Sequence, residues 1–242
     1  MDPNDNCDRV VDAMLVSGYN EEFCIALNWD PTFIAALMKA GFLVMSATLT
    51  ADGENPESID LVLPKLHIVR SALFFKDLHI KRSIRQYLSR YELHFDTGFK
   101  TIINKCIQTH GEIWLTPSLI KSIFTLREQS IKQFGQKLPV LSPTAFPRPV
   151  SFSLYRDGEL KAGEFGIICG RVYTSYSGFK EENNAGTVQM ILMTRALEEA
   201  GFDFLDFGMP LAYKTDLGAQ NISPGQFIAL FRPAQAERRD KI

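Results

Sequence analysis

The segment from residue 150 to residue 178, VSFSLYRDGELKAGEFGIICGRVYTSYSG, constrains the fold of this chain more than any other part of it. The pattern predicts two successive β-hairpins. The first hairpin turns at Asp157-Gly158, a pair that supplies the backbone conformations a tight turn needs. The second turns around Gly170. We therefore expect the centre of this protein to be an antiparallel meander of strands.

Helices surround this meander in the predicted order of elements. The clearest one covers 29–41, where Asp30 is the predicted N-cap, Pro31 lies in the first turn and Gly41 ends the helix. The other helices are predicted over 20–29, 77–91, 97–108, 117–134, 183–201 and 223–231. Outside them we predict a loop over 48–58, extended chain over 64–75, a proline-rich connector over 135–150 and a strand over 202–209. Together they predict an α+β fold of mixed α/β order with a mainly antiparallel sheet.

Composition and charge narrow the class of protein. The chain has 242 residues, 45% of them hydrophobic and 22% charged, which suits a globular protein with one large domain or two small ones. The formal net charge is −2, so any contact with nucleic acid must come from a local patch. The N-terminal MDPNDNCDRV is polar and acidic, and no apolar run approaches the roughly 20 residues of a membrane span. We expect a cytoplasmic protein. The scattered cysteines and histidines predict reduced thiols and no metal site.

One local patch of positive charge lies in the segment 77–91. Residues 76–90 contain five lysines or arginines against one acid, Asp77, which gives a local charge of +4. The segment has apolar residues at helical spacing, and its basic residues point largely away from them. Those basic residues are Lys81, Arg82, Arg85 and Arg90. The pattern is typical either of a solvated helix face or of a surface that meets a nucleic-acid backbone.

A second unusual feature is the carboxylate of Asp206 in the strand GFDFLDFGMP. Leu205 and Phe207 flank it, so the acid is predicted to lie in a surrounding of low polarity. Such a carboxylate either pairs with a structural Arg or Lys, or takes part in proton transfer. The residue pattern leaves both interpretations open.

A third feature is the predicted helix start at Asn184, Ala185 and Gly186. Free N–H groups at a helix start can hold a phosphate or polarise a carbonyl group. An ordinary helix start, whose free N–H groups are capped by asparagine side chains, explains the pattern equally well.

These features occur in an order that resembles the leucyl/phenylalanyl-tRNA–protein transferase family. The resemblance is carried by YTSYSGF, ENNAGTVQ, FDFLDFGMP, YKTDLGAQN and ISPGQF in the second half of the chain. Upstream, LHIKRS at Leu78 to Ser83 and GEIWLT around Trp114 resemble two further family segments, and WDPTFIAALMKAGF resembles an N-terminal one.

The resemblance implies an acetyltransferase-like (GNAT-like) C-terminal domain, here 75–242, and a smaller N-terminal α/β domain, here 1–74. It implies transfer of an amino acid, of the leucine or phenylalanine type or another, from charged tRNA to the N-terminal amine of an acceptor protein, which tags that protein for degradation. Aminoacyl-tRNA would be a co-substrate, with no cofactor and no membrane partner, and we expect a monomer.

The resemblance also assigns roles to single residues. Asp206 matches a catalytic aspartate that helps to draw the proton from the attacking amine. The aminoacyl and acceptor pocket is predicted to contain Tyr176, Ser177, Phe179, Asn184, Met190, Phe207 and Gly208. The residues predicted to bind tRNA are Trp114, Lys81, Arg82, Arg85, Arg90 and Lys214.

The chain departs from the bacterial pattern at the site itself. Gly208 stands where those proteins have glutamine, Leu211 where they have asparagine, and Tyr176 where they have glutamate. Two alternatives to the transferase are therefore kept: a binding module for tRNA or an N-terminal residue that does no chemistry, and an acetyltransferase-like enzyme with another acyl donor. The sequence leaves open which amino acid is transferred and which N-termini accept it.

Overall fold

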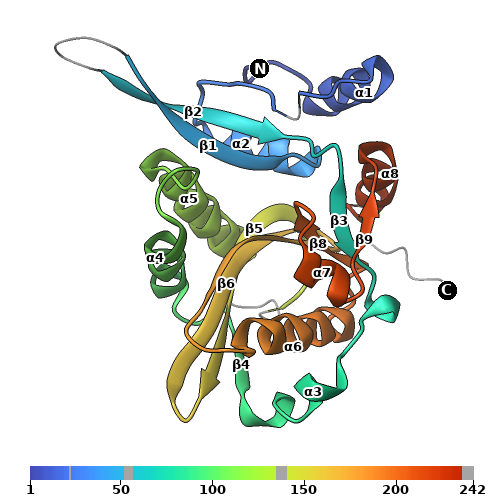
Figure 1. Ribbon diagram of the computed structural model, residues 1–242. Coiled ribbons are helices and arrows are strands. Elements are labelled where there is room, and N and C mark those ends of the chain that lie inside the picture. The colour runs from blue at the N-terminus through green and yellow to red at the C-terminus, as the bar shows by residue number, and fades with distance from the viewer. Residues whose placement is uncertain (22, 52–56, 135–140, 236–242) are drawn as a thin grey trace.

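Figure 1 shows a computed structural model of the chain, which describes residues 1–21, 23–51, 57–134 and 141–235. The helices are α1 (Cys7–Ser17), α2 (Pro31–Lys39), α3 (Arg82–Arg85), α4 (Phe99–His110), α5 (Pro117–Phe134), α6 (Ala185–Glu199), α7 (Ala212–Asp216) and α8 (Pro224–Ala234), with 3₁₀ turns at Phe75–Asp77 and Leu88–Arg90. The strands are β1 (Leu43–Thr50), β2 (Ser58–Lys65), β3 (Arg70–Leu73), β4 (Glu92–Phe95), β5 (Thr144–Arg156), β6 (Glu159–Gly170), β7 (Val172–Lys180), β8 (Phe204–Gly208) and β9 (Gln220–Ile222).

Seven of these strands form one mixed sheet in the order β4-β5-β6-β7-β8-β3-β9. The pair β7–β8 is parallel, and the other pairs are antiparallel. The predicted meander is β5, β6 and β7, and α6 is the crossover that the parallel pair requires. The α+β class with a mainly antiparallel sheet is therefore confirmed.

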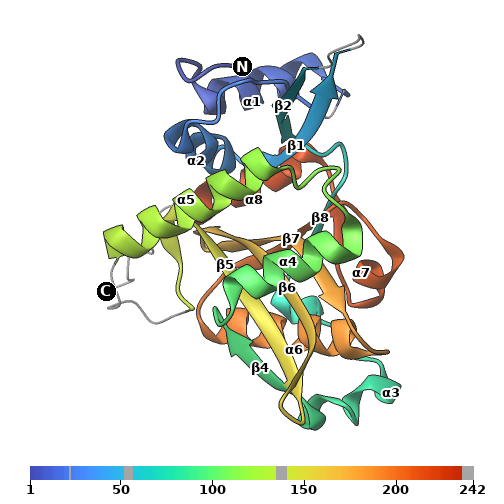
Figure 2. The same cartoon turned by 90° about the vertical axis from the view of Figure 1, so that its left-hand side faces the viewer.

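Helices cover both faces of this sheet (Figures 1 and 2). On the face covered by α4 and α5, called the α4 face here, the Phe165 ring packs edge-on against Phe99. On the opposite face, the α6 face, Tyr173 and Phe207 pack in one buried cluster with Met193. Alternation along each strand therefore decides which of two separate cores a side chain enters.

The N-terminal part adds α1, α2 and the two-stranded ribbon β1–β2 above the sheet (Figure 1). Helix α8 packs beside α2, and Gly41 permits this approach, since a Cβ there would lie 2.7 Å from Cδ1 of Ile228. Strand β3 lies before the expected domain boundary at 74/75, yet it pairs with β8 and β9 in the large sheet. The division into two domains stays a prediction.

Most predicted helices are confirmed. Asp30 accepts hydrogen bonds from Thr32 N–H and Phe33 N–H at the start of α2, and Ser223 forms a capping box with Gln226 at the start of α8. The helices predicted over 97–108, 117–134 and 183–201 correspond to α4, α5 and α6.

Several predicted elements were wrong. In place of a helix over 20–29, Phe23 and Ala26 form bridges to the edge of β2. The helix over 77–91 is broken into α3 and two 3₁₀ turns. The first and last residues of the predicted loop over 48–58 belong to strands β1 and β2. The predicted connector over 135–150 contains the start of β5, and its residues 135–140 lie outside the described part.

The four cysteines form no disulfide. Within the described ranges, no helix combines the length and the apolar character that crossing a membrane requires.

Candidate functional site

Asp206 lies at the centre of the large sheet. Strand β8 runs between β7, where Thr174 is opposite Asp206, and β3, where Ala72 is opposite it. Alternation places Asp206 on the side that faces α8, and its side chain is fully buried. The predicted burial of this carboxylate is therefore confirmed.

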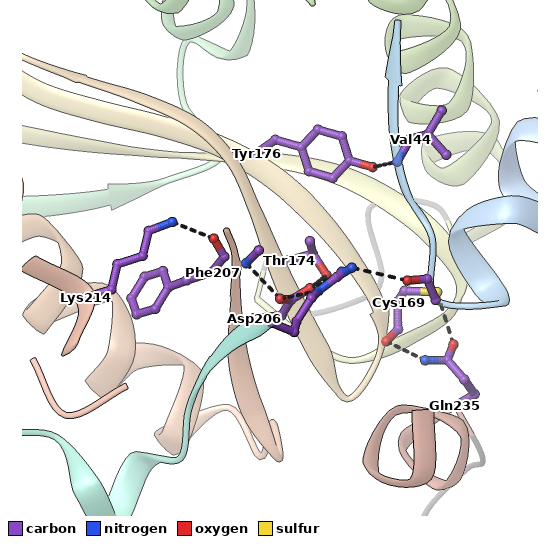
Figure 3. Close-up of polar contacts among 11 residues, drawn as sticks. Val44, Cys169, Thr174, Tyr176, Asp206, Phe207, Lys214 and Gln235 are labelled. Carbon is purple, nitrogen blue, oxygen red and sulfur yellow. Dashed lines mark hydrogen bonds and ion pairs between the residues drawn. The ribbon is translucent and has the colours of Figure 1, made fainter. Parts of the chain in front are cut away.

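Asp206 forms an ion pair with Arg70, which is only 1% exposed. Arg70 Nε donates to Asp206 Oδ1 over 2.8 Å, and Arg70 Nη2 donates to Asp206 Oδ2 over 2.5 Å, so the ion pair is bidentate (Figure 3). The guanidinium also lies 4.1 Å from the centroid of the Phe227 ring. The structural ion pair that the sequence left open as one interpretation is thus present.

Two further donors complete the surroundings of the carboxylate. Thr174 Oγ1 donates to Oδ2 and Gly208 N–H donates to Oδ1, each over 2.9 Å. Burial by itself would raise the pKa of Asp206. The positive charge of Arg70 and the hydrogen bonds from Arg70, Gly208 and Thr174 outweigh burial and hold this pKa below its usual value. A carboxylate has about four lone-pair positions, and four donors fill them. This geometry argues against the expected role of Asp206 as proton acceptor, because a proton would have to displace an existing donor.

His67 stands beside this ion pair and was not singled out by the sequence. It is 4% exposed, and among the described residues its Nε2 has no hydrogen-bond partner. That nitrogen lies 3.5 Å from where a Cβ on Gly208 would be. Burial lowers the pKa of His67 to about 3, with help from the charges of Arg70 and Lys65. The site therefore holds a neutral imidazole next to the position where the bacterial pattern has glutamine.

An aromatic group closes the other side of the ion pair. The hydroxyl of Tyr176 accepts the Val44 N–H over 3.1 Å (Figure 3), and its ring lies 6.5 Å from that of Trp114, centroid to centroid. A cavity of about 10 Å³, room for roughly one water molecule, lies between Arg70, Thr174 and Tyr176. The structure thus brings Tyr176 and Trp114 together, although the sequence placed them in different parts of the site.

The remaining residues of the predicted pocket do not gather in one place. Tyr176 and Phe179 pack into the core of the α4 face. Ser177 lies between them on β7, and its backbone carbonyl accepts a hydrogen bond from the Cys106 thiol. Met190 and Phe207 pack on the α6 face. Asn184 begins α6 with a φ of 69° and makes no side-chain cap. The predicted pocket residues thus belong to two different packing clusters, one on each face of the sheet, and their assignment to one pocket stays a prediction.

Lys214 corrects another expectation. Its ammonium donates to the Phe207 carbonyl over 2.7 Å (Figure 3). It also donates to the Met209 carbonyl over 2.7 Å, and the residue is 8% exposed. Burial lowers the pKa of Lys214 to about 8. Instead of facing a tRNA phosphate, this lysine holds the end of β8.

The four basic residues of the segment 77–91 are all exposed, as expected: Lys81, Arg82, Arg85 and Arg90. Lys81 pairs with Asp216 over 2.5 Å. Figures 1 and 2 both show α3 at the end of the molecule away from the ribbon β1–β2, whereas Trp114 bonds Ser46 of that ribbon through its carbonyl. The basic segment and Trp114 therefore do not form one continuous surface.

Comparison with known proteins identifies the family. A family model described as leucyl/phenylalanyl-tRNA protein transferase matches residues 72–232, more than half of the chain. The chain belongs to this family. The match includes Asp206, Trp114, Tyr176 and the basic segment, whereas Arg70 and His67 lie just before it.

Individual relatives agree with this membership. The chain is 29% identical over 163 residues to a leucyl/phenylalanyl-tRNA–protein transferase of Pseudomonas putida strain W619, a match that covers 65% of each protein. It is 26% identical over 166 residues to the protein of that name from Hahella chejuensis, covering 66% of this chain and 64% of the other. The chain thus spans about 65% of the length of the curated relatives it matches.

One solved structure that aligns with this chain is the C-terminal (DUF2156) domain of a protein assigned as a lysylphosphatidylglycerol synthetase from Agrobacterium fabrum. The alignment covers 96% of this chain and 78% of the chain in that structure. The identity is 11% and the TM-score is 0.39.

Proposed function

We propose that this protein is an aminoacyl-tRNA–protein transferase, which moves an amino acid from charged tRNA to the N-terminal amine of an acceptor protein and so marks that protein for degradation. The observation that carries the proposal is the family match over residues 72–232. The proposal includes the GNAT-like architecture for the large sheet, an action in the cytoplasm as a monomer, and aminoacyl-tRNA as co-substrate without a further cofactor. The meander β5–β7 followed by α6 and the parallel strand β8 is compatible with that architecture.

The reaction does not depend on a strong base. The amine attacks the ester carbonyl, a C–N bond forms, the C–O bond to the terminal ribose breaks, and the ribose oxygen leaves with a proton. An α-amino group has a pKa of about 7.7 to 8.0, so a useful fraction is already uncharged near neutral pH. A site that positions the amine and the ester can therefore catalyse the reaction even though four donors occupy Asp206.

We propose that His67 positions the attacking amine and that Asp206 holds the neighbouring residues of the site in place. Neutral Nε2 of His67 can accept one N–H of the incoming amine, and in the described residues it has no other partner. Asp206 fixes Arg70, Thr174 and the Gly208 backbone around it. The aromatic face of Trp114, next to Tyr176, suits stacking on the terminal adenosine of the tRNA.

The proposal is tested by transfer of labelled amino acids from charged tRNA to peptides with varied N-termini. The wild type is expected to form a peptide-bonded product. His67→Phe, which keeps a ring but has no nitrogen acceptor, is expected to lower kcat/KM by about tenfold, the effect of one hydrogen bond in the transition state. His94→Phe on the exposed edge strand β4 is the matched control and is expected to keep full activity.

Saturable binding of tRNA or peptide with no product from any donor would contradict the transferase and favour the non-catalytic binding module. Equal activity of His67→Phe and the wild type would remove His67 from the mechanism and leave the transferase standing.

The basic segment supplies a separate prediction about tRNA. If Arg82, Arg85 and Arg90 meet the phosphate backbone, the affinity for tRNA falls steeply as salt rises, because bound counterions are released. Arg85→Glu is then expected to weaken binding by about tenfold for every tRNA sequence and to reduce the slope of log affinity against log salt by about one. Filter binding at several salt concentrations measures both quantities.

Arg9→Glu is the control for this charge reversal, because exposed Arg9 lies on α1, at the end of the molecule away from α3 (Figures 1 and 2). Equal loss of affinity in both variants would show that only the net charge matters and would exclude a specific role for the segment.

A further inference from the structure

Glu164 is a buried acid that none of the roles above uses. It lies in the middle of β6 and is 5% exposed. The Tyr173 hydroxyl donates to its Oε1 over 2.9 Å, and the Ser175 hydroxyl is near enough to help lower the pKa of the carboxyl group. Within the described residues no Lys, Arg or His nitrogen forms an ion pair with it. Glu164 thus differs from Asp206, which has its own arginine.

A buried acid without a cation is costly when it is ionised. Burial raises the pKa of Glu164 to about 7, and its interactions with Tyr173 and Ser175 and the nearby charge of Lys214 offset this only in part. Lys214 is not free to approach, because its ammonium donates to two backbone carbonyls. A cation from outside the chain would remove this cost.

The surrounding backbone is built to accommodate the acid and its tyrosine. A Cβ on Gly166 would lie 2.6 Å from the Tyr173 hydroxyl oxygen, so only glycine there allows that ring its position. Gly178 is directly opposite Glu164 in the sheet, and a Cβ on it would lie 3.0 Å from the Glu164 Cβ. Residues opposite each other in a sheet share a face, so the neighbour of Glu164 contributes no side chain.

This acid lies on the α6 face together with half of the expected amino-acid pocket. Tyr173, its hydrogen-bond partner, packs in one cluster with Phe207 and Met190, which the family resemblance places in that pocket. Tyr213 of α7 is 48% exposed, and its pKa is raised first by partial burial and then by the nearby charge of Glu164. An apolar wall with one buried carboxylate and hydroxyl groups beside it suits a long side chain that ends in a positive charge.

We propose that Glu164 recognises the cationic side chain of a basic amino acid, arginine or lysine, carried by the donor tRNA. This inference rests on the proposed transferase function. The guanidinium or ammonium pairs with the Glu164 carboxylate, and the aliphatic stem lies against Met190 and Phe207. Glu164 is thereby a specificity-determining residue, and the preferred donor of this family member is basic instead of leucine or phenylalanine.

Two measurements test the inference. In the first, kcat/KM for transfer is compared for arginyl-, lysyl-, leucyl- and phenylalanyl-tRNA with the wild type, Glu164→Gln and the control Glu198→Gln on the exposed side of α6. The wild type is expected to prefer the basic donors by at least about tenfold, and Glu164→Gln to lose about tenfold or more with these donors alone. A wild type that uses leucine or phenylalanine at least as well as arginine and lysine overturns the inference, as does an equal loss with all donors.

The second measurement does not need catalysis. Calorimetric binding of 3′-arginylamino-3′-deoxyadenosine is compared with that of its leucyl counterpart, for the wild type and Glu164→Gln. Selective binding of the arginyl compound that Glu164→Gln abolishes supports the inference even if no transfer occurs, and in that case only the transferase function fails. Equal binding of both compounds overturns the inference.

A third outcome locates the cation elsewhere. If Glu164→Gln weakens only the reaction with acceptor peptides that begin with Arg or Lys, whatever the donor, the carboxylate serves the acceptor, and the assignment to the donor is overturned. Glu164→Gln keeps the size of the side chain and an acceptor for Tyr173, and near-native thermal unfolding of the variant verifies that its fold is intact.

Discussion

Asp206→Ala is expected to destabilise the protein by about 3 to 5 kcal/mol, because it removes one half of a buried ion pair and leaves the other half without a counter-charge. Arg70 is 1% exposed, and after the change the contacts left to its guanidinium among the described residues are the Gly41 carbonyl at 3.4 Å and the face of Phe227. The loss is measured as the free energy of unfolding in urea, followed by circular dichroism. Low transfer activity of this variant therefore cannot be read as the loss of a catalytic base.

A double-mutant cycle separates the pair from its surroundings. Arg70→Met is expected to be destabilising by itself, since it leaves the Asp206 carboxylate buried, whereas Arg70→Met with Asp206→Ala removes both charges and is expected to lose much less than the sum of the two. Additive effects would mean that the two side chains are not coupled. An Asp206→Ala protein as stable as the wild type would contradict the geometry of the site.

The sequence predicted those elements whose signals are local. The N-caps Asp30 and Ser223 and the Asp157-Gly158 turn each act within a few residues of chain, and all three lie where expected. The helix predicted over 77–91 failed because a distant partner holds its backbone: His79 N–H donates to the Leu217 carbonyl, and Leu78, with φ −58° and ψ 111°, is not helical. The helix over 20–29 failed for the same reason, since Ala26 exchanges hydrogen bonds with Val62.

The residues of the candidate site also differ in whether the sequence carries a local signal for them. An acid between Leu205 and Phe207 is visible as a buried carboxylate, but its partner Arg70 lies 136 residues away and carries no local signal. His67 also needs the fold, because only the sheet places it beside Gly208. Glu164 was detectable, since it interrupts the apolar residues of KAGEFGII as Asp206 interrupts its own strand.

Glu164→Gln is expected to stabilise the protein increasingly as the pH rises toward 8. The pKa of Glu164 is about 7 in the fold, against about 4.5 for an ordinary glutamate, so the folded state binds a proton more tightly than the unfolded state does. Between these values the unfolded chain ionises first, and the stability of the wild type therefore falls as the pH rises. One pKa unit corresponds to about 1.4 kcal/mol, so the cost approaches about 3 kcal/mol near pH 8, and glutamine, which does not ionise, avoids it.

The measurement is the difference in unfolding free energy between Glu164→Gln and the wild type at several pH values from 4 to 8. Near pH 4 the difference is expected to be small, because the acid is protonated in both states. The other groups facing Glu164 do not imitate this trend: burial raises the pKa of Tyr173 and Tyr213, and Lys214 titrates only near the upper limit, at about 8. His67, whose pKa is about 3, destabilises the fold as the pH falls, but it is present in both proteins and cancels. Parallel stability curves would show that Glu164 already has a compensating cation, and the free carboxylate required for a basic donor would then be absent.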